Sequence, residues 1–203
     1  IIVDEGEWKN STGPLYAYWF GAYDPESMIL NIPLVYNVTL NSSSNDTLCD
    51  WIFIGSDNEI IIDDSICPGL DIIHGETYFF KVRTINSAGL FTETISDGIT
   101  IDIGKPTMGN IISSHEEGVW GVNSTQKNVV VRWPNAHDDL SGIYGFSYVL
   151  DTRSDTIPDN IPEGQMGDFA SEVSVNYSNV IDGVLYFHIK PRDVAGNWGD
   201  TEH

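Results

Sequence analysis

The stretch that decides the fold runs from Tyr78 to Gly89 and reads Tyr-Phe-Phe-Lys-Val-Arg-Thr-Ile-Asn-Ser-Ala-Gly. In its first half, Tyr78, Phe80 and Val82 fall on one side of an extended chain, and the residues between them fall on the other. Its last four residues, Asn-Ser-Ala-Gly, are typical of a turn. The pattern therefore predicts a half-buried β-strand that ends in a turn.

The same pattern occurs a second time in the chain. Two pairs of segments align without gaps: Phe80–Gly89 with Phe187–Gly196, and Trp19–Ile29 with Trp133–Ile143. Two copies of one module of about 100 residues explain this repetition. We expect the first module at 1–104, with an insertion near 41–70, and the second module at 105–203.

Short runs of β-forming residues recur along the chain, and helical periodicity is nearly absent. The runs lie at 15–20, 33–40, 51–54, 59–62, 77–85, 98–103, 128–133, 146–150, 172–177 and 184–190. Turn residues separate them at the spacing expected of a β-sandwich. The sequence thus predicts an all-β fold made of two antiparallel β-sandwiches in tandem.

Some of these framework residues resemble those of fibronectin type III domains. The run from Tyr78 to Gly89 is similar to the segment in which strand F of that family leads into strand G, and Trp19 and Trp133 are similar to its strand B tryptophan. In the second module Leu185 stands where Tyr78 stands in the first, which is a departure from the family pattern. The resemblance implies fibronectin type III-like, immunoglobulin-like sandwiches.

A narrower resemblance concerns the second module. Its residues Asp138-x-x-Ser141-Gly142-Ile143 and Asp193-x-Ala-Gly-Asn-Trp198 are similar to fibronectin-type and immunoglobulin-like repeats of large microbial and archaeal cell-surface proteins. The resemblance implies a repeat of a large extracellular protein, whose first partners are neighbouring domains of the same polypeptide. Because the chain begins at Ile1, we expect a segment of something longer.

The charge balance excludes some classes of partner. Thirty acidic residues against nine Lys and Arg give a net charge of −21. A nucleic-acid binder needs clustered cations to neutralise phosphates, and so does a protein that docks on an anionic membrane. No apolar run approaches the roughly 20 residues of a membrane span, so we expect no membrane insertion by this segment.

Two features favour an extracellular or cell-surface location. Cys49 and Cys67 form an isolated pair that suits one disulfide in an oxidising compartment, with two buried free thiols as the alternative. Six Asn-x-Ser/Thr sequons are candidate glycosylation sites: Asn10, Asn37, Asn41, Asn45, Asn123 and Asn176. Attached glycans need such solvent-facing positions.

Catalytic motifs are missing from the sequence. It contains no nucleophile elbow, zinc helix, phosphate loop or dinucleotide fingerprint. The adjacent carboxylates Asp138 and Asp139 diverge on a loop and make a poor acid/base pair. The five histidines are scattered, and we expect them on the surface. The sequence predicts no catalytic residues and no enzyme.

Calcium is the one ligand that the acidic loops favour. Ca²⁺ takes six to eight oxygen ligands, usually from loops. The candidates are Asp138, Asp139, Asp193 and Asn197 in the second module and Asp24 and Glu26 in the first. In a fibronectin-like sandwich the loops after strands B and F meet at one end, which would bring the second-module residues together. The alternative is that these residues cap turns.

The function expected from these features is that of a structural, spacer or adhesion module of a secreted or cell-surface glycoprotein. The alternative is a recognition module that binds a glycan or a protein, as in a receptor ectodomain or an accessory domain of a polysaccharide-active enzyme. An exposed aromatic patch or a groove on one module would favour the alternative.

Overall fold

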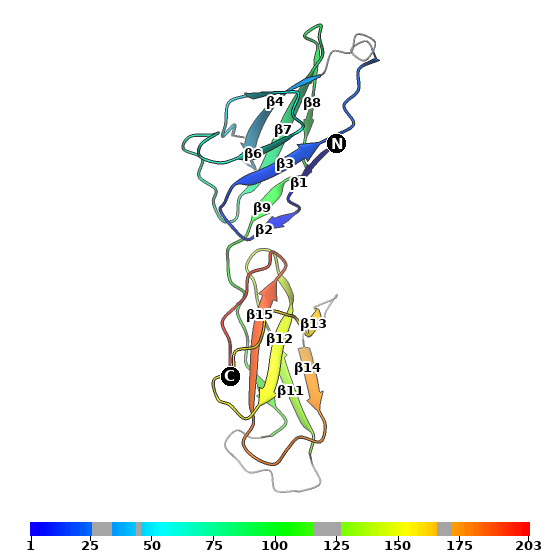
Figure 1. The fold of residues 1–203 in the computed structure, drawn as a ribbon. Helices are drawn as coiled ribbons and strands as arrows, with labels where there is room; N and C mark the ends of the chain where they lie inside the picture. The colour runs from blue at the N-terminus through cyan, green and yellow to red at the C-terminus, as the bar shows by residue number, and fades with distance from the viewer. Residues whose placement is uncertain (26–33, 44–45, 116–126, 166–171) are drawn as a thin grey trace. The chain divides into compact units, whose positions relative to one another are not determined.

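The structure of the 203-residue chain is a computed structural model. It describes residues 1–25, 34–43, 46–115, 127–165 and 172–203. The chain divides into two compact units, Ile1–Ile103 and Gly104–His203, one residue before the predicted boundary. All the named elements are β-strands, and nearly all pair in antiparallel fashion (Figure 1). This confirms the predicted all-β, antiparallel fold class.

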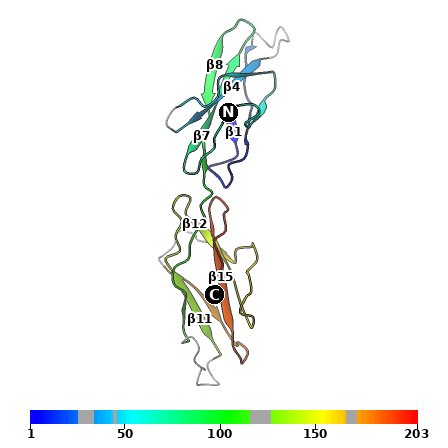
Figure 2. The ribbon, with the colours of Figure 1, turned by 90° about the vertical axis from the view of Figure 1, so that its left-hand side faces the viewer.

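The first unit consists of two sheets. One has three strands in the order β1-β3-β6, namely β1 (Ile2–Asp4), β3 (Leu15–Trp19) and β6 (Glu59–Ile62). The other has six: β2 (Trp8–Lys9), β9 (Ile99–Ile101), β7 (Thr77–Ile85), β4 (Val35–Ser42), β5 (Ile52–Gly55) and β8 (Phe91–Ile95). Strand β8 pairs with β7 alone, and β4 and β7 run side by side in both views (Figures 1 and 2).

Alternation along the strands builds the core between these two sheets. Tyr78, Phe80 and Val82 on β7 are buried, while Lys81 and Arg83 lie on the outer face, as the sequence predicts. Strand β3 alternates in the same way, with Leu15, Ala17 and Trp19 directed inward. The inward side chains of both sheets belong to one hydrophobic cluster.

Two polar side chains hold the ends of β7. At its start, the Tyr78 hydroxyl accepts a hydrogen bond from Ile73 N at 2.9 Å and donates one to Asp71 O at 3.3 Å. At its far end, Asn86 Oδ1 accepts hydrogen bonds from the backbone N–H groups of Ala88 and Leu90, both at 3.0 Å. Gly89 has φ +79°, a left-handed conformation that glycine adopts without strain, so the predicted turn forms here.

The second unit also consists of two sheets, each with three strands. One has the order β10-β11-β14, with β10 (Ile112–Ser113), β11 (Val129–Pro134) and β14 (Glu172–Tyr177). The other has the order β13-β12-β15, with β13 (Gly164–Gln165), β12 (Ile143–Asp151) and β15 (Tyr186–Asp193). Trp133 lies on the middle strand of its three-stranded sheet, as Trp19 lies on the middle strand β3.

Aromatic rings surround Trp133 in the core of the second unit. Its ring centroid lies 5.6 Å from Phe146, 5.3 Å from Tyr148 and 5.6 Å from Phe187. Offset and edge-to-face arrangements at such distances are favourable beyond the area they bury. Among the described residues, Trp19 has one such neighbour, Tyr36, at 5.5 Å. The second core is thus centred on its tryptophan.

Five strands were not predicted from the sequence: β1, β2, β8, β10 and β13. Four of them have only two or three residues, too few for a pattern of alternation. Strand β8 is longer, but all five of its residues are exposed, so no inward face marks it in the sequence. Only its backbone pairing with β7 identifies β8 as a strand.

The expectation that all histidines lie on the surface was wrong for His188. It is fully buried on the outer side of β15, and its Nε2 donates a hydrogen bond to the backbone oxygen of Arg153 at 2.8 Å. Lys190, two residues on, is 7% exposed and donates to Asn160 Oδ1 at 2.6 Å, and burial lowers its pKa. The segment after β12 therefore covers this sheet face.

Truncation of the central ring tests the described packing of the second core. Trp133→Ala should lower the free energy of unfolding by about 3–5 kcal/mol, because it removes the ring that contacts three other aromatic side chains. Urea unfolding followed by circular dichroism measures this change. The matched control is Ile112→Ala, whose side chain is 52% exposed and should change stability by less than about 0.5 kcal/mol. A similar loss in both variants would contradict the described core.

Candidate functional sites

The cysteine pair forms a disulfide in the first unit. Cys49 and Cys67 are joined, with their Cα atoms 5.6 Å apart, and both residues are buried. The Thr39 hydroxyl on β4 donates a hydrogen bond to the backbone oxygen of Cys49. The bridge ties together two points of the 41–70 segment that are eighteen residues apart, and the hydrogen bond ties one of them, Cys49, to β4.

The carboxylates of the second unit form turns at its loops. Asp138 Oδ1 accepts hydrogen bonds from Leu140 N at 3.1 Å and Gly142 N at 2.8 Å. Asp193, which ends β15 and is fully buried, accepts from Gly196 N at 2.6 Å and Asn197 N at 2.7 Å. Asp193 thus plays the role in its turn that Asn86 plays in the first unit.

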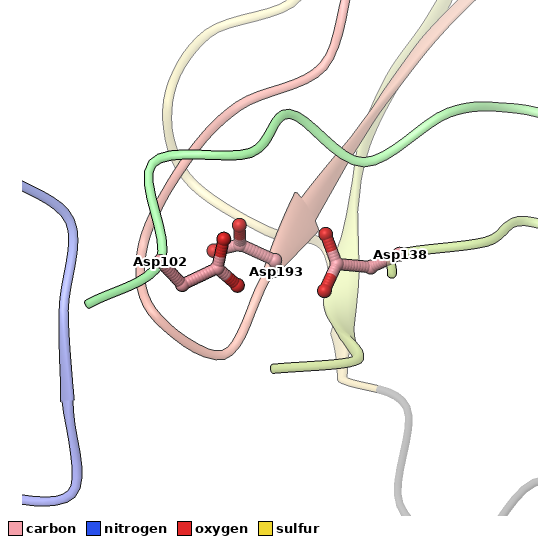
Figure 3. A group of neighbouring side chains, drawn as sticks. All are labelled: Asp102, Asp138 and Asp193. Carbon is pink, nitrogen blue, oxygen red and sulfur yellow. The ribbon is translucent and has the colours of Figure 1, made fainter. Parts of the chain in front are cut away.

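The structure brings Asp138 and Asp193 together, as the sequence predicts. Carboxylate oxygens of the two residues lie within 4.8 Å of each other (Figure 3). Two hydrogen bonds connect their loops: Ala195 N donates to Ser141 Oγ at 3.2 Å, and Val194 N donates to Gly142 O at 2.9 Å. The backbone N–H donors around both carboxylates offset the repulsion between their like charges.

The structure does not show the other predicted calcium ligands with an oxygen directed at this pair of carboxylates. Asp139 is exposed, and its carboxylate lies 2.7 Å from His137 Nε2. Asn197 points its amide nitrogen at Asp193 Oδ2, at 2.7 Å. In the first unit, Asp24 is half-buried, and Glu26 lies outside the described residues. Calcium on these loops stays a prediction from the sequence.

Asp102, also drawn in Figure 3, was not found by sequence reasoning. It belongs to the first unit, where its Oδ1 lies 3.6 Å from His74 Nδ1. Its backbone N–H donates to Lys9 O at 2.9 Å. A single aspartate after an apolar strand has no motif around it, so nothing in the sequence marks it.

The sequons differ in their surroundings. Asn10 and Asn176 are exposed, whereas Asn37 and Asn41 are half-buried on β4. The Oδ1 atoms of Asn37 and Asn41 are buried and have no hydrogen-bond partner among the described residues. Asn45 and Asn123 lie outside the part of the chain that the structure describes.

An aromatic stripe follows the outer face of β3. Tyr16, Tyr18 and Phe20 occupy alternate positions, and their successive ring centroids are 6.2 Å and 6.3 Å apart. Tyr18 is 39% exposed and Phe20 50%. The Tyr16 hydroxyl donates a hydrogen bond to Glu59 Oε2 at 2.9 Å, and this bond raises the pKa of Tyr16.

A second group of aromatic side chains lies on the outer face of the β5-β4-β7-β8 sheet. The Arg83 guanidinium lies between two rings, 4.2 Å from the centroid of Trp51 and 4.3 Å from that of Phe91. Glu93 accepts hydrogen bonds from Arg83 and Lys81, which lower the pKa of Glu93. We call Trp51, Phe53, Arg83 and Phe91 the aromatic–arginine face.

No family model and no curated protein sequence matches this chain. Among solved structures, the fibronectin(III)-like modules of Clostridium thermocellum CbhA superpose with a TM-score of 0.51 at 11% identity, covering 100% of this chain and 90% of that one. The fold is fibronectin type III-like. The FN1–FN3 domains of chicken CNTN1 have a TM-score of 0.48 at 13% identity, with 98% of this chain and 63% of that chain covered.

The described strands fit this fold at the positions that the sequence resemblance indicated. Trp19 and Trp133 each occupy the middle strand of a three-stranded sheet, and Tyr78 binds backbone groups before its strand. Leu185, the counterpart of Tyr78, is half-buried. Among the described residues, no helix is long and apolar enough to cross a membrane.

A calcium titration tests the predicted cation site. If calcium binds at Asp138 and Asp193, millimolar calcium should raise the Tm of the second unit, because a ligand that binds only the folded state stabilises it. Asp193→Asn should abolish the rise, while Asp139→Asn, at an exposed carboxylate paired with His137, should reduce it little. Scanning calorimetry with and without chelator measures this, and an unchanged Tm would leave both residues as turn formers.

Proposed function

We propose that this chain is a non-catalytic structural spacer or adhesion module of a secreted or cell-surface glycoprotein. The observation that carries the proposal is the division into two units, each closed around its own hydrophobic cluster. Such a unit is stable without a partner and is suited to repetition along a polypeptide. Its partners are then neighbouring domains of the same polypeptide.

The polar groups support a structural role. Asp138, Asp193 and Asn86 accept hydrogen bonds from backbone N–H groups of their own turns. A carboxyl group that acts as a general acid or base has to be available to a substrate. These three groups serve the backbone instead, which favours a scaffold over an enzyme.

The covalent features support an extracellular location. Disulfides persist in oxidising compartments and are rare in the cytosol, and Cys49 and Cys67 are bridged in the first unit. Asn10 and Asn176 present exposed side chains in sequons, from which an attached glycan would extend into water. Both features suit a secreted glycoprotein.

Recognition of a glycan or a protein is the second candidate function, and the aromatic stripe favours it. Tyr18 and Phe20 are exposed, and Phe20 borders a groove of about 260 Å³ that also includes Tyr23 and Thr94. Exposed aromatic side chains beside a groove are typical of binding surfaces.

Substitution of Phe20 tests this second candidate function. Phe20→Ala should weaken any glycan binding at least tenfold, because it removes an exposed ring at the groove, while Ile112→Ala in the other unit should not change it. A glycan array followed by titration measures the two affinities.

Single-molecule pulling tests the spacer role. The full chain should unfold in two separate events, one for each unit, because each has its own core. The Cys49–Cys67 bridge hides a loop of 18 residues from extension, so reduction should lengthen one event by roughly 60 Å and leave the other unchanged. One cooperative event for the whole chain would contradict the proposal.

A further inference from the structure

We propose that Asn37 carries an N-linked glycan whose first sugars lie on the aromatic–arginine face of the first unit. This inference rests on the proposed extracellular location and adds to it a specific modified residue and a specific place for the glycan. The site is the sequon Asn37-Val38-Thr39 on strand β4.

The strand register places Asn37 within this face. On one side its cross-strand partner is Phe53 of β5, and on the other side it is Arg83 of β7. Directly opposed residues in a sheet have Cβ atoms about 4.5–5.5 Å apart and project to the same face. A sugar attached to Asn37 therefore starts between the Phe53 ring and the Arg83 guanidinium.

The face has the properties of a surface that a sugar would cover. Phe53 is 67% exposed and Phe91 59%, and single rings of this kind bring apolar area into water. A pyranose ring has an apolar side of C–H groups that packs on aromatic faces, and hydroxyls around its edge that accept hydrogen bonds from a guanidinium. The stack between Trp51 and Phe91 fixes the position of Arg83 in advance.

The charges on this face are compatible with a neutral occupant. Glu93 bonds both Lys81, at 2.6 Å, and Arg83, at 2.6 Å, so each cation of β7 already has an anionic partner, although one carboxylate balances only one of the two positive charges. An acidic partner would compete with Glu93 for these cations, and a basic partner would be repelled by them. A neutral carbohydrate does neither.

The side-chain oxygen of Asn37 also lacks a partner among the described residues. This Oδ1 is buried and accepts no hydrogen bond from the described residues, a state that costs free energy. Among the described residues, this oxygen therefore makes no hydrogen bond that attachment at Nδ2 would break.

The modification must precede folding. Thr39, the third residue of the sequon, is 3% exposed, and its hydroxyl donates to Cys49 O in the folded unit. The unfolded chain presents both residues freely. Attachment joins Asn37 Nδ2 to the anomeric carbon of the sugar, releases one proton from Nδ2, and breaks the bond from that carbon to the diphosphate of a lipid-linked oligosaccharide donor.

The test is a double-mutant cycle on the full chain secreted from glycosylating cells. Wild type, Asn37→Gln, Phe53→Ala and the double variant are compared by peptide mass spectrometry for glycan occupancy and by calorimetry for the Tm of the first unit. Asn37→Gln should lower this Tm by roughly 4 °C when Phe53 is present, and by much less in Phe53→Ala. Ile61→Ala removes another exposed apolar side chain, on the other sheet; it is the control and should leave the effect of Asn37→Gln unchanged.

The same four proteins made without glycosylation complete the cycle. In that material the effect of Asn37→Gln should depend on Phe53 only as far as the two neighbouring side chains couple directly, and therefore much less than in the glycosylated protein. An empty Asn37 beside occupied Asn10 or Asn176 would overturn this inference alone, whereas six empty sequons would overturn the proposed glycoprotein as well. The inference would also be overturned if the coupling between Asn37 and Phe53 were absent from the glycosylated protein or equal in both preparations. Binding of an added oligosaccharide to this face when Asn37 is unmodified would overturn it as well.

Discussion

The packing of one tryptophan between two sheets is the interaction on which each unit depends. Trp19 and Trp133 lie on the middle strands β3 and β11, and both are almost completely buried. Their Nε1 atoms have no hydrogen-bond partner among the described residues, so each ring is held by its apolar contacts alone. Burial of such a ring must outweigh the roughly 1–3 kcal/mol that an unpaired buried donor costs. The other apolar side chains of each core supply these contacts.

Turn chemistry positions the strands that face the tryptophans. Asn86 and Asp193 occupy equivalent places after β7 and at the end of β15, and each binds backbone N–H groups of its own turn. This shared geometry explains why an asparagine in one copy replaces an aspartate in the other, since both offer the same acceptor oxygen. It also places Asp193 near Asp138, because the turn brings the end of β15 to the loop before β12.

Features that depend on local pattern were predictable from the sequence, and features that depend on distant segments were not. The bounds of β6, β7 and β14 match the predicted runs. Within such runs inward and outward residues alternate, and turn residues mark where the runs end. The pairing of Asp138 with Asp193 followed from the expected order of loops. The burial of His188 did not, because a segment remote in sequence covers it. The aromatic–arginine face likewise arises from β5, β7 and β8, and only the register of β5 with β4 brings Asn37 beside Phe53.

The central claim is that the chain consists of two independently stable sandwiches. The most direct measurement is the amide NMR spectrum of each of the separate segments Ile1–Ile103 and Gly104–His203. The account predicts that each segment folds alone and gives the dispersed resonances of a folded β-sandwich. A collapsed, poorly dispersed spectrum for either segment would contradict it.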